Sequence, residues 1–211
     1  MSKDIIKDRI LILDFGSQYT QLIARRVREM GVYCEIYHHK SSFSAIKKFN
    51  PQGVILSGGP ETVKQKGSPK VPDKLFNLDI PLLGICYGMQ AIAKQLGGKV
   101  ELAQKREFGH ADLKLKNQAS GLFKGIKNKS INVWMSHGDH VSSLPKDFKS
   151  CASSNNSPIA ALFNPSKKIF GLQFHPEVTH TPQGKKILKN FVRDICKCQG
   201  LWNSKNIITK N

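Results

Sequence analysis

Short β-rich runs alternate with helical patterns over the first hundred residues of this chain. The strand-like runs are mostly continuous apolar stretches, as expected for strands that are buried on both faces. In order, the strand-like and helical segments cover residues 9–15, 18–30, 32–37, 43–49, 51–56, 80–86 and 89–96. Ser17 is the expected N-cap of the first helix, and Gly31 its stop. This order predicts an α/β fold with an open, mostly parallel central sheet flanked by helices.

Beyond residue 100 the strand-like segments follow one another in a pattern that indicates antiparallel pairing. They cover residues 112–116, 131–135, 159–163 and 169–174. A last helix is expected over residues 183–196, because Ile187, Phe191 and Ile195 recur at helical spacing and would be buried together. We therefore expect an antiparallel C-terminal extension of the sheet, followed by a helix.

Composition constrains the size, compartment and partners of the protein but does not identify its function. With 211 residues, of which 39% are hydrophobic, the chain fits one domain with a substantial core. No apolar run is long enough to span a bilayer and the start lacks a secretory signal, so we expect a cytoplasmic protein without a membrane partner. The formal charge is +18, but the lysines are spread along the chain and no recognition motif organises them. We favour a solvated basic surface, or an acidic partner domain, over nucleic-acid binding.

The cysteines are scattered and odd in number, which fits a reducing compartment rather than a disulfide framework. They are Cys34, Cys86, Cys151, Cys196 and Cys198. Cys196 and Cys198 stand two apart in a predicted helix, so their side chains should point to different faces. No matching Cys or His cluster stands elsewhere, and we expect no metal site.

Cys86 stands in a pattern that favours chemistry. Residues 82–88 read Leu-Leu-Gly-Ile-Cys-Tyr-Gly, a strand followed by G-x-C-x-G and then a helix. This is the nucleophile-elbow pattern, in which a sharp turn without neighbouring Cβ atoms lifts the nucleophile out of the sheet. At the start of the next helix, the helix dipole and free N–H groups favour a thiolate. Taken alone, the pattern fits a buried cysteine in a glycine turn equally well.

Two further motifs follow predicted strands. His175 and Glu177 lie on one face of an extended segment, with Pro176 between them, and a carboxylate beside an imidazole is the arrangement found in triads. Residues 57–60, Ser-Gly-Gly-Pro, follow the run 51–56 at the sheet edge where parallel sheets bind ligands. An N–H of this loop would be able to hold an oxyanion together with that of Tyr87. Each motif alone is more often an ordinary turn, and the spacing of a phosphate-binding P-loop is absent.

In this order, the three motifs resemble those of the class I (triad) glutamine amidotransferases, over about residues 9–202. The resemblance is greatest to the amidotransferase domain of the GMP synthetases. That likeness rests on Leu-Asp-Phe-Gly-Ser-Gln-Tyr at 13–19, Arg-Glu-Phe-Gly at 106–109, Trp-Met-Ser-His-Gly-Asp at 134–139 and His-Pro-Glu-Val-Thr-His-Thr at 175–181. It implies the class I amidotransferase fold and hydrolysis of glutamine to glutamate and ammonia, for amination of XMP to GMP.

The resemblance also implies roles for individual residues. Cys86 would be the nucleophile, His175 the general acid/base and Glu177 its orienting partner. Gly59 and Tyr87 would supply the N–H groups of the oxyanion hole. The positions that match the family's glutamine-binding residues are Gln90, Ser136, Gly138 and Asp139. We expect the remaining histidines of this segment, at 137 and 140, to be structural, and the pair at 38–39 to be incidental.

The resemblance further implies partners that this sequence does not encode. The family's pyrophosphatase loop, Ser-Gly-Gly-x-Asp-Ser, does not occur. ATP and Mg²⁺ would therefore bind to a separate synthetase domain, joined in cis or as a subunit, through which a homodimer would form; no cofactor is expected in this part. We expect the amidotransferase domain over residues 1–202 and the start of a linker over 203–211. Two alternatives stay open: a non-catalytic glutamine-binding or regulatory subunit, and the glutaminase subunit of another class I amidotransferase.

Overall fold

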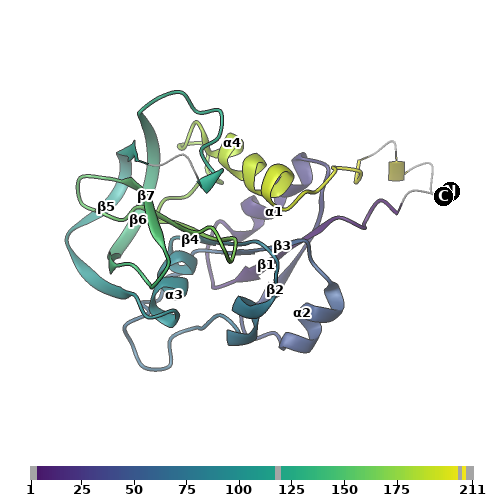
Figure 1. Ribbon diagram of the computed structural model, residues 1–211, viewed down its shortest axis with the longest axis horizontal. Coiled ribbons are helices and arrows are strands. Elements are labelled where there is room, and N and C mark those ends of the chain that lie inside the picture. Colours follow the sequence, from purple (N-terminus) through teal and green to yellow (C-terminus); the bar gives the residue numbers. More distant parts are fainter. Residues whose placement is uncertain (1–3, 117–119, 204–205, 208–211) are drawn as a thin grey trace.

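A nine-stranded sheet runs through the part of the chain that the computed structural model describes, residues 4–116, 120–203 and 206–207 (Figure 1). Its strand order is β2-β1-β3-β4-β9-β8-β7-β5-β6. The strands are β1 (Arg9–Asp14), β2 (Tyr33–His38), β3 (Gly53–Leu56), β4 (Leu82–Ile85), β5 (Lys99–Leu115), β6 (Ser130–Ser143), β7 (Lys149–Ser153), β8 (Ala161–Asn164) and β9 (Ile169–Leu172). The helices are α1 (Thr20–Glu29), α2 (Phe43–Phe49), η1 (Asp73–Asn77), α3 (Tyr87–Gln95), α4 (Gly184–Lys189) and η3 (Asn190–Ile195).

The sheet has a parallel part and an antiparallel part. β2, β1, β3, β4 and β9 are parallel neighbours. From β9 outward, β8, β7, β5 and β6 pair antiparallel. The predicted α/β fold with an antiparallel extension is confirmed.

Helices cover both faces of the parallel part, which explains the continuous apolar runs of its strands. α1 and α4 lie on one face, and α2 and α3 on the other (Figure 1). Successive side chains of β1 divide between two core clusters: Ile10 and Ile12 belong to the cluster that includes α1 and α4, and Leu11 and Leu13 to the one that includes α2 and α3. Strands buried on both faces need apolar residues at every position rather than at alternate ones.

The predicted start of the first helix was wrong. α1 begins at Thr20, and Tyr19 precedes it as the N-cap residue without a side-chain cap. Ser17 instead accepts a hydrogen bond from the N–H of Tyr19 at 3.0 Å, which forms a turn before the helix. Residues 16–19 therefore form a loop at the end of β1, and this loop lies beside the candidate site described below.

The antiparallel part differs most from the sequence prediction. β5 and β6 form a hairpin far longer than the predicted segments 112–116 and 131–135, and β7 was not predicted. The segment at 169–174 was placed with the antiparallel strands, but β9 pairs parallel with β4 on one side and antiparallel with β8 on the other. β9 is the strand at which the two parts of the sheet meet.

The last predicted helix is also irregular. α4 gives way at Asn190 to a π-helical segment, η3. The wider turn leaves Ile195 only partly buried, although Ile187 and Phe191 are buried as predicted. Cys196 and Cys198 lie beyond η3 and are both buried in the same core cluster, so the prediction that they point to different faces of a helix was wrong.

The end of the described chain packs on the body of the protein. The N–H of Trp202 donates to the carbonyl of Gly31 at 2.8 Å, and its ring meets that of Tyr33 edge-on. Most of the predicted linker, 203–211, lies outside the described residues. Within the described residues, no helix is both long and apolar enough to cross a membrane.

Candidate active site

The loops that follow four parallel strands meet at one edge of the sheet. β1 leads into residues 15–19, β3 into the Ser-Gly-Gly-Pro loop at 57–60, β4 into Cys86, and β9 into the segment Gln173–Glu177. Parallel strands present all their carboxyl ends at the same edge, so motifs that are far apart in the sequence are brought together there.

Cys86 occupies the sharp turn that its flanking glycines predict. It has φ 51° and ψ −105°, a backbone conformation that costs a non-glycine residue about 1–3 kcal/mol. A Cβ at Gly84 would lie 2.5 Å from the carbonyl carbon of Gly88, and a Cβ at Gly88 would lie 2.7 Å from the carbonyl oxygen of Leu56. The turn therefore closes only because both neighbours lack side chains, and it places Cys86 directly before α3.

His175 and Glu177 form a buried pair beside this cysteine. The Nδ1 of His175 lies 2.7 Å from Oε1 of Glu177. Burial alone would lower the pKa of His175, but the Glu177 carboxylate and the nearby Cys86 outweigh it and raise the pKa well above its usual value. The raised pKa favours the imidazolium form of the ring.

The backbone of the His-Pro-Glu segment is fixed from two sides. The N–H of His175 donates to the carbonyl of Trp134 on β6 at 3.0 Å. The Nε of Arg26 on α1 donates to the carbonyl of Glu177 at 3.0 Å. Arg26 is itself buried. These bonds hold the ring and the carboxylate in place independently of each other.

The loop after β3 closes over the cysteine. A Cβ at Gly58 would lie 3.1 Å from Cε1 of His175 and 3.6 Å from the Cβ of Cys86, and a Cβ at Gly59 would lie 2.5 Å from the carbonyl oxygen of Phe15. Within the described chain, no acceptor pairs with the backbone N–H of Gly59 or of Tyr87. Gly59 and Tyr87 both line the cavity that opens from the cysteine.

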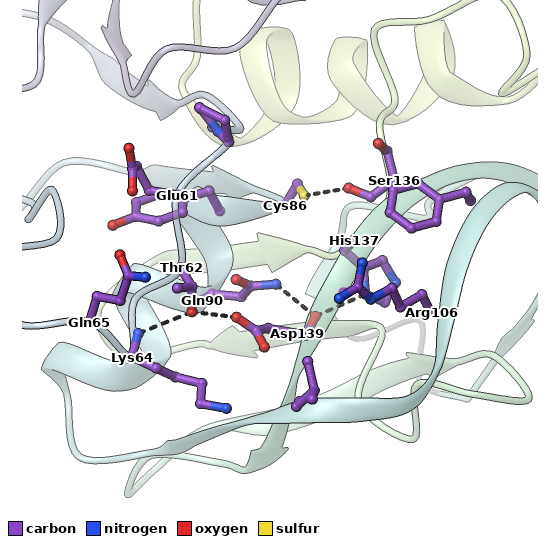
Figure 2. A pocket seen from close by; sticks show the side chains of 16 residues that line it. Glu61, Thr62, Lys64, Gln65, Cys86, Gln90, Arg106, Ser136, His137 and Asp139 are labelled. Atoms are coloured by element: carbon purple, nitrogen blue, oxygen red, sulfur yellow. Dashed lines mark hydrogen bonds between the residues drawn. The ribbon is translucent and has the colours of Figure 1, made fainter.

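A cavity of about 590 Å³ opens from Cys86 between this loop and the β5–β6 hairpin (Figure 2). All the predicted glutamine-binding residues line it, together with Gly59 and Tyr87. A second cavity, of about 350 Å³, reaches Cys86 from the side of residues 16–19 and is lined by His175. The sulfur is thus accessible from two directions, and His175 lines the smaller cavity.

Hydrogen bonds connect the walls of the larger cavity (Figure 2). The Nε2 of Gln90 donates to the carbonyl oxygen of Asp139 at 2.9 Å, and the Asp139 carboxylate accepts from Thr62 at 2.5 Å. The carbonyl oxygen of Ser136 lies 3.5 Å from the Cys86 sulfur. Gly138 lies beneath the side chain of Arg106, with its Cβ position 3.6 Å from Nε.

The other histidines take different places. His137 is buried and bonds to Glu107 at 3.0 Å, and Nδ1 of His140 is buried without a partner among the described residues. The rings of His38 and His39 lie against each other in a tilted arrangement, and both residues line a separate cavity beside the loop 65–73. None of these rings lies against the cysteine.

Several residues of the site gave no sequence signal. Thr62 falls in what was predicted to be a loop, and Gln173, whose amide lies 3.8 Å from the Cys86 sulfur, precedes the His-Pro-Glu motif. Arg26 belongs to the first helix, where its apolar neighbours dominate the pattern. In the described residues no group of three or more His, Cys, Asp or Glu side chains is placed to hold a metal ion.

The fold and the site together define an α/β protein with a cysteine at a nucleophile elbow and a His–Glu pair beside it. The sequence model of the family described as glutamine amidotransferase class-I matches residues 11–195. The chain belongs to this family, and the predicted resemblance is confirmed.

Individual relatives narrow the comparison. The chain is 56% identical to the GMP synthase [glutamine-hydrolyzing] of Hahella chejuensis and 52% identical to that of Photorhabdus laumondii, in each case over 99% of this chain. It spans 41% of the length of both relatives. Among solved structures, a Thermoplasma acidophilum protein provisionally named as one subunit of a GMP synthase matches with a TM-score of 0.81 and 32% identity, over 97% of this chain and 98% of that one. A glutamine amidotransferase of Thermotoga maritima, at 19% identity, shares the fold with a TM-score of 0.72, over 90% of this chain and 99% of that one.

Proposed function

We propose that this chain hydrolyses glutamine to glutamate and ammonia, as the amidotransferase part of a GMP synthase. The observation that carries the proposal is that Cys86, at a strained elbow, and His175, whose ring is bonded at 2.7 Å to Glu177, line one cavity. A Cβ at Gly58 would lie 3.6 Å from the Cβ of Cys86 and 3.1 Å from Cε1 of His175. The cavity of about 590 Å³ beside the sulfur is large enough for an amino acid, and its walls carry both charged and amide groups. The names of the relatives supply the substrate.

In the first half of the proposed reaction, the Cys86 sulfur attacks the side-chain amide carbon of glutamine. Negative charge that develops on the amide oxygen is held by the N–H groups of Gly59 and Tyr87. His175 then donates its proton to the leaving nitrogen, so that the C–N bond breaks, ammonia departs and a glutamyl thioester remains.

In the second half, His175 is neutral and accepts a proton from an incoming water molecule. The resulting attack on the thioester releases glutamate and returns the sulfur and the imidazolium. Glu177 keeps the Nδ1 proton directed toward itself and so leaves the other ring nitrogen for the sulfur side. Gln90, Ser136, Gly138 and Asp139 would bind the main-chain end of glutamine.

The rest of the proposal concerns parts that this chain does not contain. The ammonia would aminate XMP on a synthetase domain that binds ATP and Mg²⁺, attached in cis or as a separate chain, and that domain would form the homodimer. The amidotransferase part would need no cofactor, metal or nucleic acid. A cytoplasmic location is supported by the five cysteines, all of them free.

Replacing the nucleophile tests the proposal. We expect Cys86→Ala to lower the rate of glutamate release by several orders of magnitude, because removal of a triad nucleophile leaves only residual catalysis. Cys34→Ala is the matched control, since burial raises the pKa of the Cys34 thiol to about 11 and its sulfur donates to a helix carbonyl. Wild-type rates in Cys86→Ala would end the proposal.

Labelling separates an enzyme from a binding subunit on the same fold. A glutamine-analogue electrophile should modify Cys86 stoichiometrically, as read by peptide mass spectrometry. Burial raises the pKa of Cys151 and Cys198 to about 12, which makes these thiols unreactive internal controls. Glutamine binding without labelling would favour the non-catalytic alternative.

A further inference from the structure

Both ring nitrogens of His137 face hydrogen-bond acceptors. Nε2 lies 3.0 Å from Oε2 of Glu107, and Nδ1 lies 2.9 Å from the backbone carbonyl oxygen of Asp139. A neutral imidazole carries one N–H and would turn a lone pair toward one of these oxygens, whereas an imidazolium donates to both. The ring is buried, with 5% of its surface exposed, so water does not offer an alternative donor.

The acceptor on β5 is held in its ionised form. Glu107 stands directly opposite His137 in the β5–β6 register. Burial opposes ionisation of this carboxyl, but hydrogen bonds from His137, Ser157 and Ser154 outweigh it and lower its pKa to about 2. The two serine hydroxyls donate at 2.8 Å each, one to each carboxylate oxygen. The carboxylate thus has enough donors to remain charged inside the protein.

The acceptor on β6 belongs to the wall of the glutamine cavity. The carbonyl oxygen of Asp139 receives the amide of Gln90 as well as the ring of His137. Ser136 and Gly138, on either side of His137, line the cavity, and the Ser136 carbonyl reaches the Cys86 sulfur. The position of this short segment therefore depends on the ring behind it.

We propose that His137 is a positioning residue that, paired with Glu107, fixes the segment Ser136–Asp139 for glutamine binding. This inference rests on the proposed glutaminase function. Besides Glu107, the charged groups near the ring are the Asp139 carboxylate, which is occupied by Thr62, and the Arg106 guanidinium over Gly138. His137 touches neither the sulfur nor His175, so it acts on the substrate only through this segment.

Loss of the ring or of its carboxylate partner should weaken glutamine binding. Without His137 the carbonyl oxygen of Asp139 keeps only the Gln90 amide, and without the Glu107 charge the ring loses the carboxylate that holds it in place. We expect the glutamine KM of His137→Gln and of Glu107→Gln to rise by at least about tenfold, with kcat changed less.

The experiment measures kcat and KM for glutamine in the wild type, Glu107→Gln and His137→Gln. His110→Gln is the matched control, because His110 lies on the same hairpin but is exposed and contacts Asn132. Thermal melting of each variant separates a displaced binding segment from a general loss of the fold.

The outcomes separate this inference from the proposed function. A KM for glutamine equal to that of the wild type in both variants, or a fall in kcat at unchanged KM, would overturn the inference. Calorimetric binding of glutamine, with Cys86→Ala as background and Glu107→Gln added, gives the same comparison without chemistry. If the wild type binds glutamine but does not hydrolyse it, the function proposal fails, and a loss of affinity in the double variant would still support the role of His137.

Discussion

Gly58 offers a direct test of the arrangement of Cys86 and His175, because it lies close to both of them. A methyl group there would lie 3.1 Å from Cε1 of His175, and 3.6 Å from the Cβ of Cys86 and Oγ of Ser17. The backbone of Gly58 is not in the left-handed region, so alanine brings no backbone strain at this position. Gly58→Ala should therefore disturb the catalytic geometry and leave the fold intact.

The size of the effect follows from the contact distance. An ordinary contact begins at 3.4 Å, so the imidazole must give way by a few tenths of an ångström. Because a misplacement of about 1 Å can cost about 100-fold in rate, we expect kcat/KM for glutamine to fall by about 3- to 10-fold. This corresponds to about 0.7–1.4 kcal/mol of transition-state stabilisation. The melting temperature should change by no more than about 2 °C, because one methyl in a tight contact costs little stability when its neighbour can move.

Glutamate release and thermal melting are the two measurements required. The rate of Cys86 alkylation by iodoacetamide, taken across pH, adds a readout that does not depend on glutamine binding. An unchanged kcat/KM at an unchanged melting temperature would refute the inferred contact between the ring and the sulfur. A fall in activity that tracks a large fall in melting temperature would refute the claim that the change is local.

Three other substitutions test the elbow, the His–Glu pair and the last helix. Gly84→Ala places a Cβ 2.5 Å from backbone and should destabilise the protein by about 2–3 kcal/mol, which lowers the melting temperature by about 5–10 °C. Gly97→Ala, at φ 95° with open space around it, is the control and should cost about 1 kcal/mol. Equal losses in the two variants would contradict the steric argument. Because the folded pKa of His175 is raised, its contribution to stability is complete below about pH 6.5 and is lost as pH rises through the folded value. In urea unfolding, the free energy of unfolding of the wild type should therefore fall above about pH 6.5, and that of Glu177→Gln should fall less. The same dependence on pH in both proteins would refute the charge on the ring. Asn190→Ala removes hydrogen bonds of 2.7 and 2.9 Å to the carbonyls of Leu122 and Lys124, and we expect it to lower the free energy of unfolding in urea by about 2 kcal/mol. A loss below about 0.5 kcal/mol would show that water replaces these bonds.

The parallel part of the fold was predictable because its strands are apolar on both faces. The run at 9–15 contains no alternation, and β1 divides its side chains between two cores as such a run requires. The β5–β6 hairpin could not be predicted to its full length, because its polar residues alternate with few buried ones and several point into solvent. The parallel pairing of β9 with β4 joins residues that are more than eighty positions apart, and local periodicity carries no information on such pairing.

The candidate site was predictable where the chemistry needs a special backbone. The glycines at 84 and 88 are required by the turn itself, and His175 and Glu177 are joined by their spacing. Glu107 could not be found in this way, since its partner is set by strand register and its serines come from a loop beyond β7. Residues that hold a binding segment from behind leave no local pattern.

The position of the site follows from β9, which belongs to both parts of the sheet. Its parallel neighbour, β4, ends at Cys86, and the loop that continues β9 carries His175 and Glu177. The N–H of His175 then bonds to Trp134 of β6, so the antiparallel part is tied to the same loop that carries the acid/base candidate. A shift of the β5–β6 hairpin would therefore move the segment Ser136–Asp139 and the imidazole together relative to the sulfur, whereas a shift of β4 alone would separate the sulfur from both. Changes in the hairpin should therefore act first on the distance between nucleophile and base. A partner that touches the hairpin would influence the rate through β9, where the two parts of the sheet meet.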